Sequence, residues 1–197
     1  NLLHARAPLT VAPGNHEFDR STPDAAVTAI RQSDFAWVGA NVSLRSGDKD
    51  ADTGLKPETI VQIGDFRVGI FGLTLTPQDG GNEREYLSYA DSYIASARES
   101  LERLQAADVD LVVGLTHLHL ETDLELAKLR RDYPNFRLIY GGHEHEPEYA
   151  AATTTTAEVM KGASNARTIW RTDVDVDQAG NITIASLPFA MDEGVVK

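Results

Sequence analysis

Hydrophobic positions recur along this chain with two periods, and their order predicts alternating strands and helices. Short apolar runs bounded by glycine, proline or polar residues predict strands over 9–12, 36–42, 67–72, 111–115 and 136–140. Apolar residues at helical spacing predict helices over 22–30, 91–104 and 121–133, the first of them with Thr22 as its cap. This alternation is typical of an α/β domain with a mainly parallel sheet.

The last part of the chain has a different pattern. From Trp170 to Asp177, apolar or threonine side chains alternate with charged ones, which is the period of a half-buried strand. A turn at 179–181 leads into a further strand over 182–184, and Gly64-Asp65 joins 59–63 to 67–72 as another hairpin. We also expect residues 1–6 to be the tail of a helix and 46–53 to form a solvated loop.

Length and composition limit the number of domains and the classes of partner. The chain has 197 residues, 42% of them hydrophobic, which is enough for one sizeable core, so we predict a single domain over 1–197. Its net charge of -12 argues against binding to nucleic acid, although bound divalent cations would still allow it to hold a small phosphate. The absence of cysteine excludes disulfides and thiolate ligands, and no apolar run is long enough for a membrane segment.

Polar side chains follow three of the predicted strands at their carboxyl ends. They are Asn15, His16 and Asp19, then His117 and His119, then His143 and His145. Taken singly, the first group could be an Asx turn, and each histidine could be a hydrogen-bonded structural residue. Because the carboxyl ends of parallel strands meet at one edge of a sheet, the three groups together favour a metal site. Imidazoles and an amide oxygen suit Mn, Fe, Zn or Ni better than Ca.

Three of these segments resemble the later motifs of the calcineurin-like metallophosphoesterases. They are Gly-Asn-His-Glu-Phe-Asp at 14–19, Thr-His at 116–117 and Gly-Gly-His-Glu-His at 141–145. The Phe18-Asp19 ending and the segments 63–74 and 161–167 are similar to the 5′-nucleotidase branch in particular. The resemblance covers nearly the whole chain and implies that family's fold, a β sandwich flanked by helices in four layers (α/β/β/α), with two metal ions along one edge.

The resemblance also implies a role for each site residue. Asn15, His117 and His143 would bind one divalent ion and His145 the other, with Mn, Zn, Fe, Ni and Mg as candidates. His16 would donate a proton to the leaving-group oxygen, Asp19 would orient its ring, and Asn15 and His16 would contact the substrate. The implied reaction is hydrolysis of a small phosphate ester, with a nucleotide as one candidate, by a metal-activated water.

The chain departs from the family pattern in its first metal ligands. The family has an Asp-x-His on a first strand and a Gly-Asp on a second, but Asp-x-His is absent here, and Gly47-Asp48 and Gly64-Asp65 both lie downstream of Asn15. We therefore expect a fragment that lacks the N-terminal part of the domain, with a degenerate relative as the alternative. We also expect no C-terminal nucleotide-binding domain within 1–197.

Three further side chains near these motifs each allow two roles. We expect Glu144 to face outward, with support of a metal ligand as the alternative. We expect Arg20 to form a surface ion pair, with binding of a phosphate oxygen as the alternative. We expect His119 to be an exposed loop histidine, with a place in the substrate pocket as the alternative.

Two other functions remain open beside a 5′-nucleotidase-like phosphomonoesterase. One is a non-catalytic binding domain that keeps the fold, and the other is a phosphodiesterase acting on cyclic or dinucleotide substrates. The resemblance favours an extracytoplasmic or periplasmic location, and the sequence predicts no oligomeric state.

Overall fold

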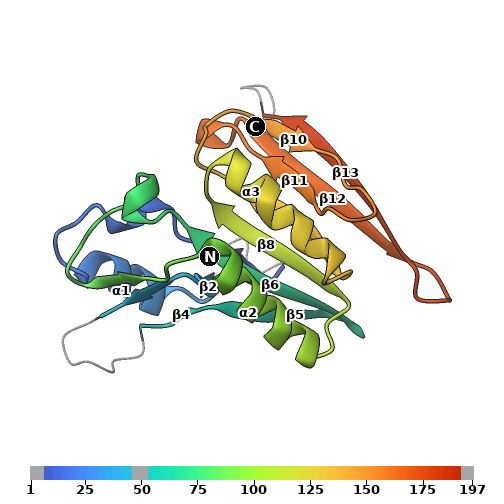
Figure 1. Ribbon diagram of the computed structural model, residues 1–197, viewed down its shortest axis with the longest axis horizontal. Helices are drawn as coiled ribbons and strands as arrows, with labels where there is room; N and C mark the ends of the chain where they lie inside the picture. Colours follow the sequence, from blue (N-terminus) through green and yellow to red (C-terminus); the bar gives the residue numbers. More distant parts are fainter. Residues whose placement is uncertain (1–6, 46–52, 192–197) are drawn as a thin grey trace.

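A computed structural model describes residues 7–45 and 53–191, so the expectations for 1–6 and for most of 46–53 lie outside the described residues. The chain forms a small parallel sheet and a larger mixed sheet, together with two antiparallel strand pairs (Figure 1). The α/β class predicted from the sequence is confirmed. Among the described residues, no helix combines the length and the apolar character needed to cross a membrane.

The smaller sheet holds the first motif. Its parallel strands are β1 (Thr10–Val11), β2 (Ala36–Val38) and β4 (Leu55–Lys56), in the order β1-β2-β4. Helix α1 (Asp24–Gln32) follows the motif and buries Ala26, Val27 and Ile30. It is capped by Pro23 rather than by the expected Thr22, and no cap side chain binds its first turn.

One predicted strand of this region is wrong in its extent. The run 36–42 is not continuous, because β2 ends at Val38 and a separate strand β3 (Val42–Leu44) pairs antiparallel with β7 (Leu87–Tyr89). Between them, Gly39 still bonds to Lys56 of β4, whereas Ala40 and Asn41 bond to strand β6 of the larger sheet. Strands β4 and β7 were not predicted, since two or three residues carry too little periodicity to be recognised.

The larger sheet carries the histidine motifs. Its strands, in the order β10-β11-β9-β8-β6-β5, are β10 (Glu148–Ala150), β11 (Glu158–Lys161), β9 (Phe136–Gly141), β8 (Leu111–His117), β6 (Phe66–Thr74) and β5 (Glu58–Ile63). The four central strands are parallel and the two outer ones antiparallel, so the predicted β5–β6 hairpin is confirmed. Strands β10 and β11 were not predicted.

The two faces of the larger sheet are covered differently, and β8 shows how. Val112 joins the core beneath helices α2 (Tyr93–Ala106) and α3 (Leu120–Ala127). A 3-10 turn over 128–131 extends α3. Leu111 and Val113 point the other way, toward the hairpin of β12 (Thr168–Val176) and β13 (Ile182–Ala190). Helices, sheet and hairpin are therefore stacked in that order, which is the sandwich arrangement that the family resemblance implied (Figure 1).

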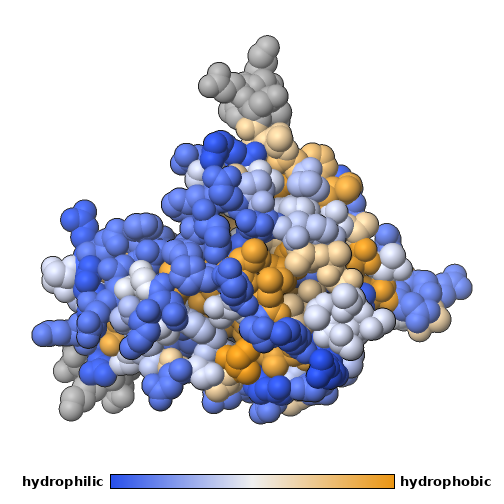
Figure 2. Space-filling view, turned by 45° about the horizontal axis from the view of Figure 1, so that its top comes forward, coloured by the Kyte–Doolittle hydropathy of each residue, from blue (hydrophilic) through white to orange (hydrophobic). Residues whose placement is uncertain are grey.

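Surface polarity differs between the ends of the molecule. The part that holds β1, β2 and α1 is mostly hydrophilic, whereas hydrophobic side chains gather near the middle of the view and toward the β12–β13 hairpin (Figure 2). On that hairpin Ile169, Leu187 and Phe189 are exposed.

The smaller and the larger sheet meet where β2 passes β6. A methyl group added at Gly72 would lie 2.0 Å from the carbonyl oxygen of Val38, so only glycine fits there. Beside it, Ala40 N–H donates to the carbonyl of Gly72. The buried amide of Asn41 donates to the carbonyl of Thr74 at 2.7 Å and accepts from its N–H at 2.9 Å. This junction fixes how the carboxyl ends of the two sheets face each other.

We expect Gly72→Ala to lower the free energy of unfolding by about 1–3 kcal/mol or more, because the added methyl meets backbone that cannot turn aside. Gly114→Ala is the matched control, since its methyl would approach the ring edge of Phe71 at 3.2 Å, a side chain that can adjust. Urea unfolding of both variants measures the difference. Equal stabilities would contradict the close approach of β2 to β6.

Candidate functional site

The first motif forms a tight turn directly after the smaller sheet. Asn15–Phe18 adopts one 3-10 turn, and the N–H of Gly14 donates to the Glu17 carboxylate at 2.7 Å. Phe18 is 1% exposed and packs with α1, so the turn has an apolar anchor below and polar side chains above. The Glu17 carboxylate thus binds the backbone of its own turn, whereas the side chains of Asn15 and His16 remain available for chemistry.

Asn15 lies against the end of β8 although 102 positions separate it from His117. The Nε2 atom of His117 and the Oδ1 atom of Asn15 are 2.9 Å apart. A methyl group on Gly14 would come within 2.8 Å of the His117 ring, and one on Gly142 within 3.3 Å. The ring therefore lies between two glycine backbones, which explains why both motifs place glycine beside their polar residues.

A second histidine stands next to this pair. The ring centroids of His117 and His143 are 5.3 Å apart, and His119 packs edge-on against His143 with centroids 4.5 Å apart. His119 is 46% exposed, as expected for a loop histidine, but its Nε2 is also 3.2 Å from the carbonyl oxygen of Asp79. His143 and His145 both have left-handed backbone, with φ of 89° and 64°, which is uncommon for residues other than glycine.

Burial and neighbouring charges lower the pKa of two of these histidines, His117 and His143. Burial is the main reason that the pKa of His117 falls to about 4, and the charges of His143 and Lys161 lower it further. Burial also lowers the pKa of His143, with help from His119. Since a metal ligand must be a neutral imidazole, this environment favours metal coordination over proton transfer at these two positions.

His16 has the opposite environment. Its ring is 72% exposed, and its Nδ1 lies 3.1 Å from the Oδ2 of Asp19, which leaves Nε2 open to solvent. The hydrogen bond from His16 lowers the pKa of Asp19, and Asn82 contributes by placing its amide nitrogen 3.3 Å from the other carboxylate oxygen. Asp19 is therefore an ionised partner that holds one ring nitrogen and exposes the other.

The loop after β6 holds this motif in place. The Asn82 amide donates to the carbonyl of Asn15 at 2.5 Å, and the Arg84 guanidinium donates to the carbonyls of Asp19 and Arg20 at 2.9 and 3.1 Å. The buried Tyr86 hydroxyl also donates to the Arg20 carbonyl, at 2.9 Å. Nothing in the sequence pattern marks these three side chains as supports of the first motif.

Beneath the histidines lies a buried charged cluster that the sequence also did not reveal. Lys161 and Asp123 are both 0% exposed and 3.0 Å apart, and the Lys161 ammonium also contacts Glu144 at 2.5 Å. The expectation that Glu144 faces outward is therefore wrong, because Lys161 draws its carboxylate inward. Lys161 ends the buried run 157–161, where a lysine requires partners, but the sequence alone does not show that this run is buried.

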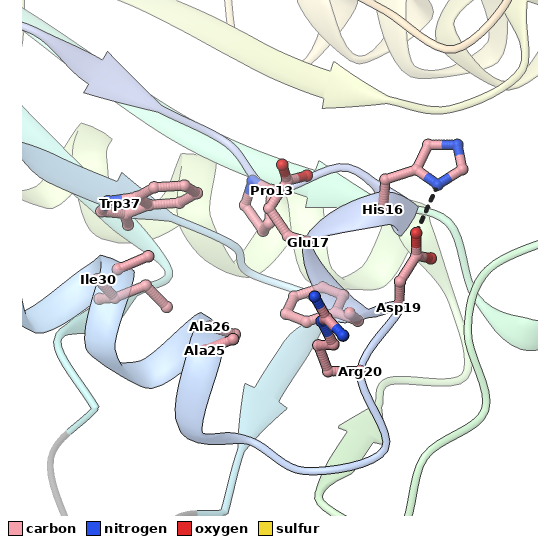
Figure 3. Close-up of a pocket in the computed structure, with 11 residues that line it drawn as sticks. Pro13, His16, Glu17, Asp19, Arg20, Ala25, Ala26, Ile30 and Trp37 are labelled. Atoms are coloured by element: carbon pink, nitrogen blue, oxygen red, sulfur yellow. Dashed lines mark hydrogen bonds and ion pairs between the residues drawn. The ribbon is translucent and has the colours of Figure 1, made fainter.

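A cavity of about 350 Å³ lies on the α1 side of the first motif (Figure 3). His16 and Asp19 stand at one end, and Ile30 and Trp37 at the other (Figure 3). Neither His117 nor His143 lines this cavity, so it is separate from the histidine cluster. Arg20 lines the cavity and, within the described residues, has no carboxylate within 4.0 Å, so its expected ion pair is wrong.

The donor set fits part of a metal centre. Within 7–45 and 53–191, no three His, Asp or Glu side chains gather closely enough to hold an ion by themselves. However, the 2.9 Å between Asn15 Oδ1 and His117 Nε2 is close to the roughly 3 Å that separates adjacent ligands placed 2.0–2.2 Å from one ion. His143 stands beside them, whereas His145 is exposed at the rim of the cluster.

No family model matches the chain, but the relatives found among known proteins are apyrases and 5′-nucleotidases. The chain is 31% identical to an apyrase of Tabanus yao over 147 residues, covering 74% of this chain and 25% of that protein. It is 26% identical to a snake venom 5′-nucleotidase of Crotalus adamanteus over 155 residues, covering 77% and 25%. The chain thus spans about a quarter of the length of these relatives.

A solved structure gives the same result at the level of the fold. The 5′-nucleotidase precursor from Thermus thermophilus superposes with a TM-score of 0.74 at 26% identity, over 92% of this chain and 38% of that chain. The fold class implied by the sequence motifs is therefore confirmed.

The burial of His117 predicts a specific pH dependence in the metal-free protein. The pKa of about 4 in the folded state lies below the ordinary 6.5, so the unfolded chain takes up a proton that the folded chain does not. The resulting stability is fully present above pH 6.5 and is lost as the pH falls toward 4. It amounts to at most about 3 kcal/mol, which solvent screening of this partly exposed ring reduces to about 1–2 kcal/mol.

Urea unfolding at pH 7 and pH 4.5 checks this for the wild type and for His117→Gln. The variant lacks the titrating ring, so its stability should fall less on acidification. Identical losses in the two proteins would show that the ring is not protected from protons.

Proposed function

Because this chain belongs to the 5′-nucleotidase branch of the calcineurin-like metallophosphoesterases, we propose that it carries part of the active site of a phosphoesterase acting on a nucleotide monophosphate ester. The observation that carries the proposal is the convergence of Asn15 and His117 at 2.9 Å, beside His143. These three side chains come from two different sheets. As a single domain, the chain would supply one nearly complete metal position and His145 toward a second.

The proposed division of labour follows the environment of each side chain. Asn15, His117 and His143 would hold one divalent ion, and His145 would contribute to another. When bound, such ions lower the pKa of a water nucleophile and neutralise charge on the phosphate. The Asp and Gly-Asp ligands of the family pattern do not occur at matching positions of this sequence, so a full centre would require ligands beyond those identified here.

His16 is the proposed proton donor. Asp19 accepts a hydrogen bond from Nδ1, so Nε2 faces outward and can deliver its proton to the leaving-group oxygen as the P–O bond breaks. The same phosphorus forms a new bond to the water oxygen. Asn15, one position earlier on the turn, would keep the phosphate next to His16.

An extracytoplasmic location is the accompanying proposal. One relative is a venom protein and another is described as a precursor, which supports export of this protein too. Fractionation of the native cells tests it, and recovery of the protein only in the cytoplasm would contradict it.

Substitution of His16 tests the proton donor. We expect His16→Ala to reduce turnover of 5′-AMP by about 10²–10⁴-fold while Mn²⁺ binding is retained. The loss on p-nitrophenyl phosphate should be much smaller, because its leaving group needs little protonation. Equal losses on both substrates would contradict a role in protonation. Phosphate release and Mn²⁺ titration measure the two properties.

Substitution of the proposed ligands tests the metal site. Asn15→Ala and His117→Ala should both weaken Mn²⁺ binding and turnover, whereas His16→Ala should affect turnover alone. Retained Mn²⁺ affinity in both ligand variants would contradict their assignment as ligands. Unaltered folding and partner binding in all three variants would favour a non-catalytic binding domain. A preference for bis-p-nitrophenyl phosphate over 5′-AMP would favour the phosphodiesterase.

A further inference from the structure

Lys161 is fully buried, and its ammonium group lies against four polar partners. Its ammonium donates to the carbonyl of Leu118 at 2.5 Å, the carbonyl of Gly142 at 3.0 Å and the carboxylate of Glu144 at 2.5 Å. These three bonds use all three N–H donors of the group. Asp123, at 3.0 Å, supplies the second negative charge.

The partners of Lys161 belong to the segments that present the histidines. Leu118 directly follows His117 at the end of β8, and Gly142 and Glu144 flank His143 in the loop after β9. One cation therefore bridges the ends of two neighbouring strands. Glu144 extends the bridge, because its second oxygen accepts from the N–H of Leu120 at 2.8 Å.

The loop that Lys161 grips has an unfavourable backbone. Left-handed φ values at His143 and His145 persist only where the surroundings enforce them. The loop is held on both sides of His143 by Lys161, and the N–H of Ser164 donates to the carbonyl of His145 at 3.1 Å. Strand β11 and the residues just after it thus form the support on which 142–145 rests.

Burial of the Lys161 and Asp123 charges is a costly way to stabilise a sheet, since well-packed apolar side chains usually do as well or better. This makes a positional role the better explanation for the cluster. We infer that Lys161, acting through Glu144 and the Gly142 carbonyl, is a positioning residue that holds His143 and His145 in their ligand orientation. The inference rests on the metal site of the proposed function.

The test compares two substitutions of nearly equal size in the intact protein. Glu144→Gln removes the charge that Lys161 uses to hold the histidine loop, but keeps an acceptor for the Leu120 N–H. Asp123→Asn removes a charge from the same ammonium on the α3 side, where the carboxylate lies beside Gly141 at the end of β9. Burial raises the pKa of Asp123 to about 6, so its carboxyl group is protonated more readily than an ordinary aspartate. Asp123→Asn is therefore a mild change and serves as the control.

We expect Glu144→Gln to raise the Mn²⁺ dissociation constant by about 10–100-fold and Asp123→Asn to leave it unchanged. In the metal-free protein, amide hydrogen exchange at 142–145 should accelerate in Glu144→Gln only. A purely structural role predicts the reverse pattern, namely lowered thermal stability in both variants with unchanged Mn²⁺ affinity and loop exchange. That pattern would overturn the inference.

Failure of the proposed function gives a different result. If Mn²⁺ does not broaden the ring resonances of His117 and His143 in the wild type, the metal site itself is wrong. The exchange comparison would still decide whether Lys161 orders the loop, because it requires no metal. Faster exchange at 142–145 in both variants would overturn the specific role of Glu144.

Discussion

The close approach of two backbones at Gly72 is the constraint on which the rest of the site depends. Asn15 and His117 belong to different sheets, so their contact exists only if the sheets are docked at a fixed distance and angle. Glycine allows β6 to reach the Val38 carbonyl, and the Asn41 side chain then pairs with Thr74 as a strand neighbour would. If the two sheets were farther apart, Asn15 and His117 would not be in contact.

The docked edge brings many polar groups together, and the chain holds them in place in two ways. On the smaller sheet, the main-chain carbonyls of 15–20 receive donors from Asn82, Arg84 and Tyr86. On the larger sheet, one buried ammonium serves carbonyls and carboxylates of several segments at once. Both devices act on backbone carbonyls and on carboxylates, and these contacts use none of the imidazole nitrogens, which stay available to bind a metal ion.

Much of the fold could be predicted because its elements carry clear periods. The helices ending near Ala106 and Arg131 and the strands ending in His117 and Gly141 repeat apolar residues over enough positions to be recognised. The short strands could not be predicted, since β4 and β7 owe their existence to neighbours distant in sequence. The same reason hid Asn82 and Lys161, whose roles depend on residues 67 and 43 positions away. Glu144 was misjudged for lack of that partner.

The environments of the histidines separate roles that the motifs alone present as equivalent. His117 is held between glycines where burial keeps it neutral, so its lone pair is available to a cation and its proton affinity is poor. His16 stands in solvent with one nitrogen bound to an ionised carboxylate, so it can exchange protons without disturbing its neighbours. With the two environments exchanged, the metal ligand would be exposed to solvent, and the proton donor would be buried where its protonated form is unfavourable. The arrangement therefore suits a hydrolase that separates charge neutralisation from proton delivery.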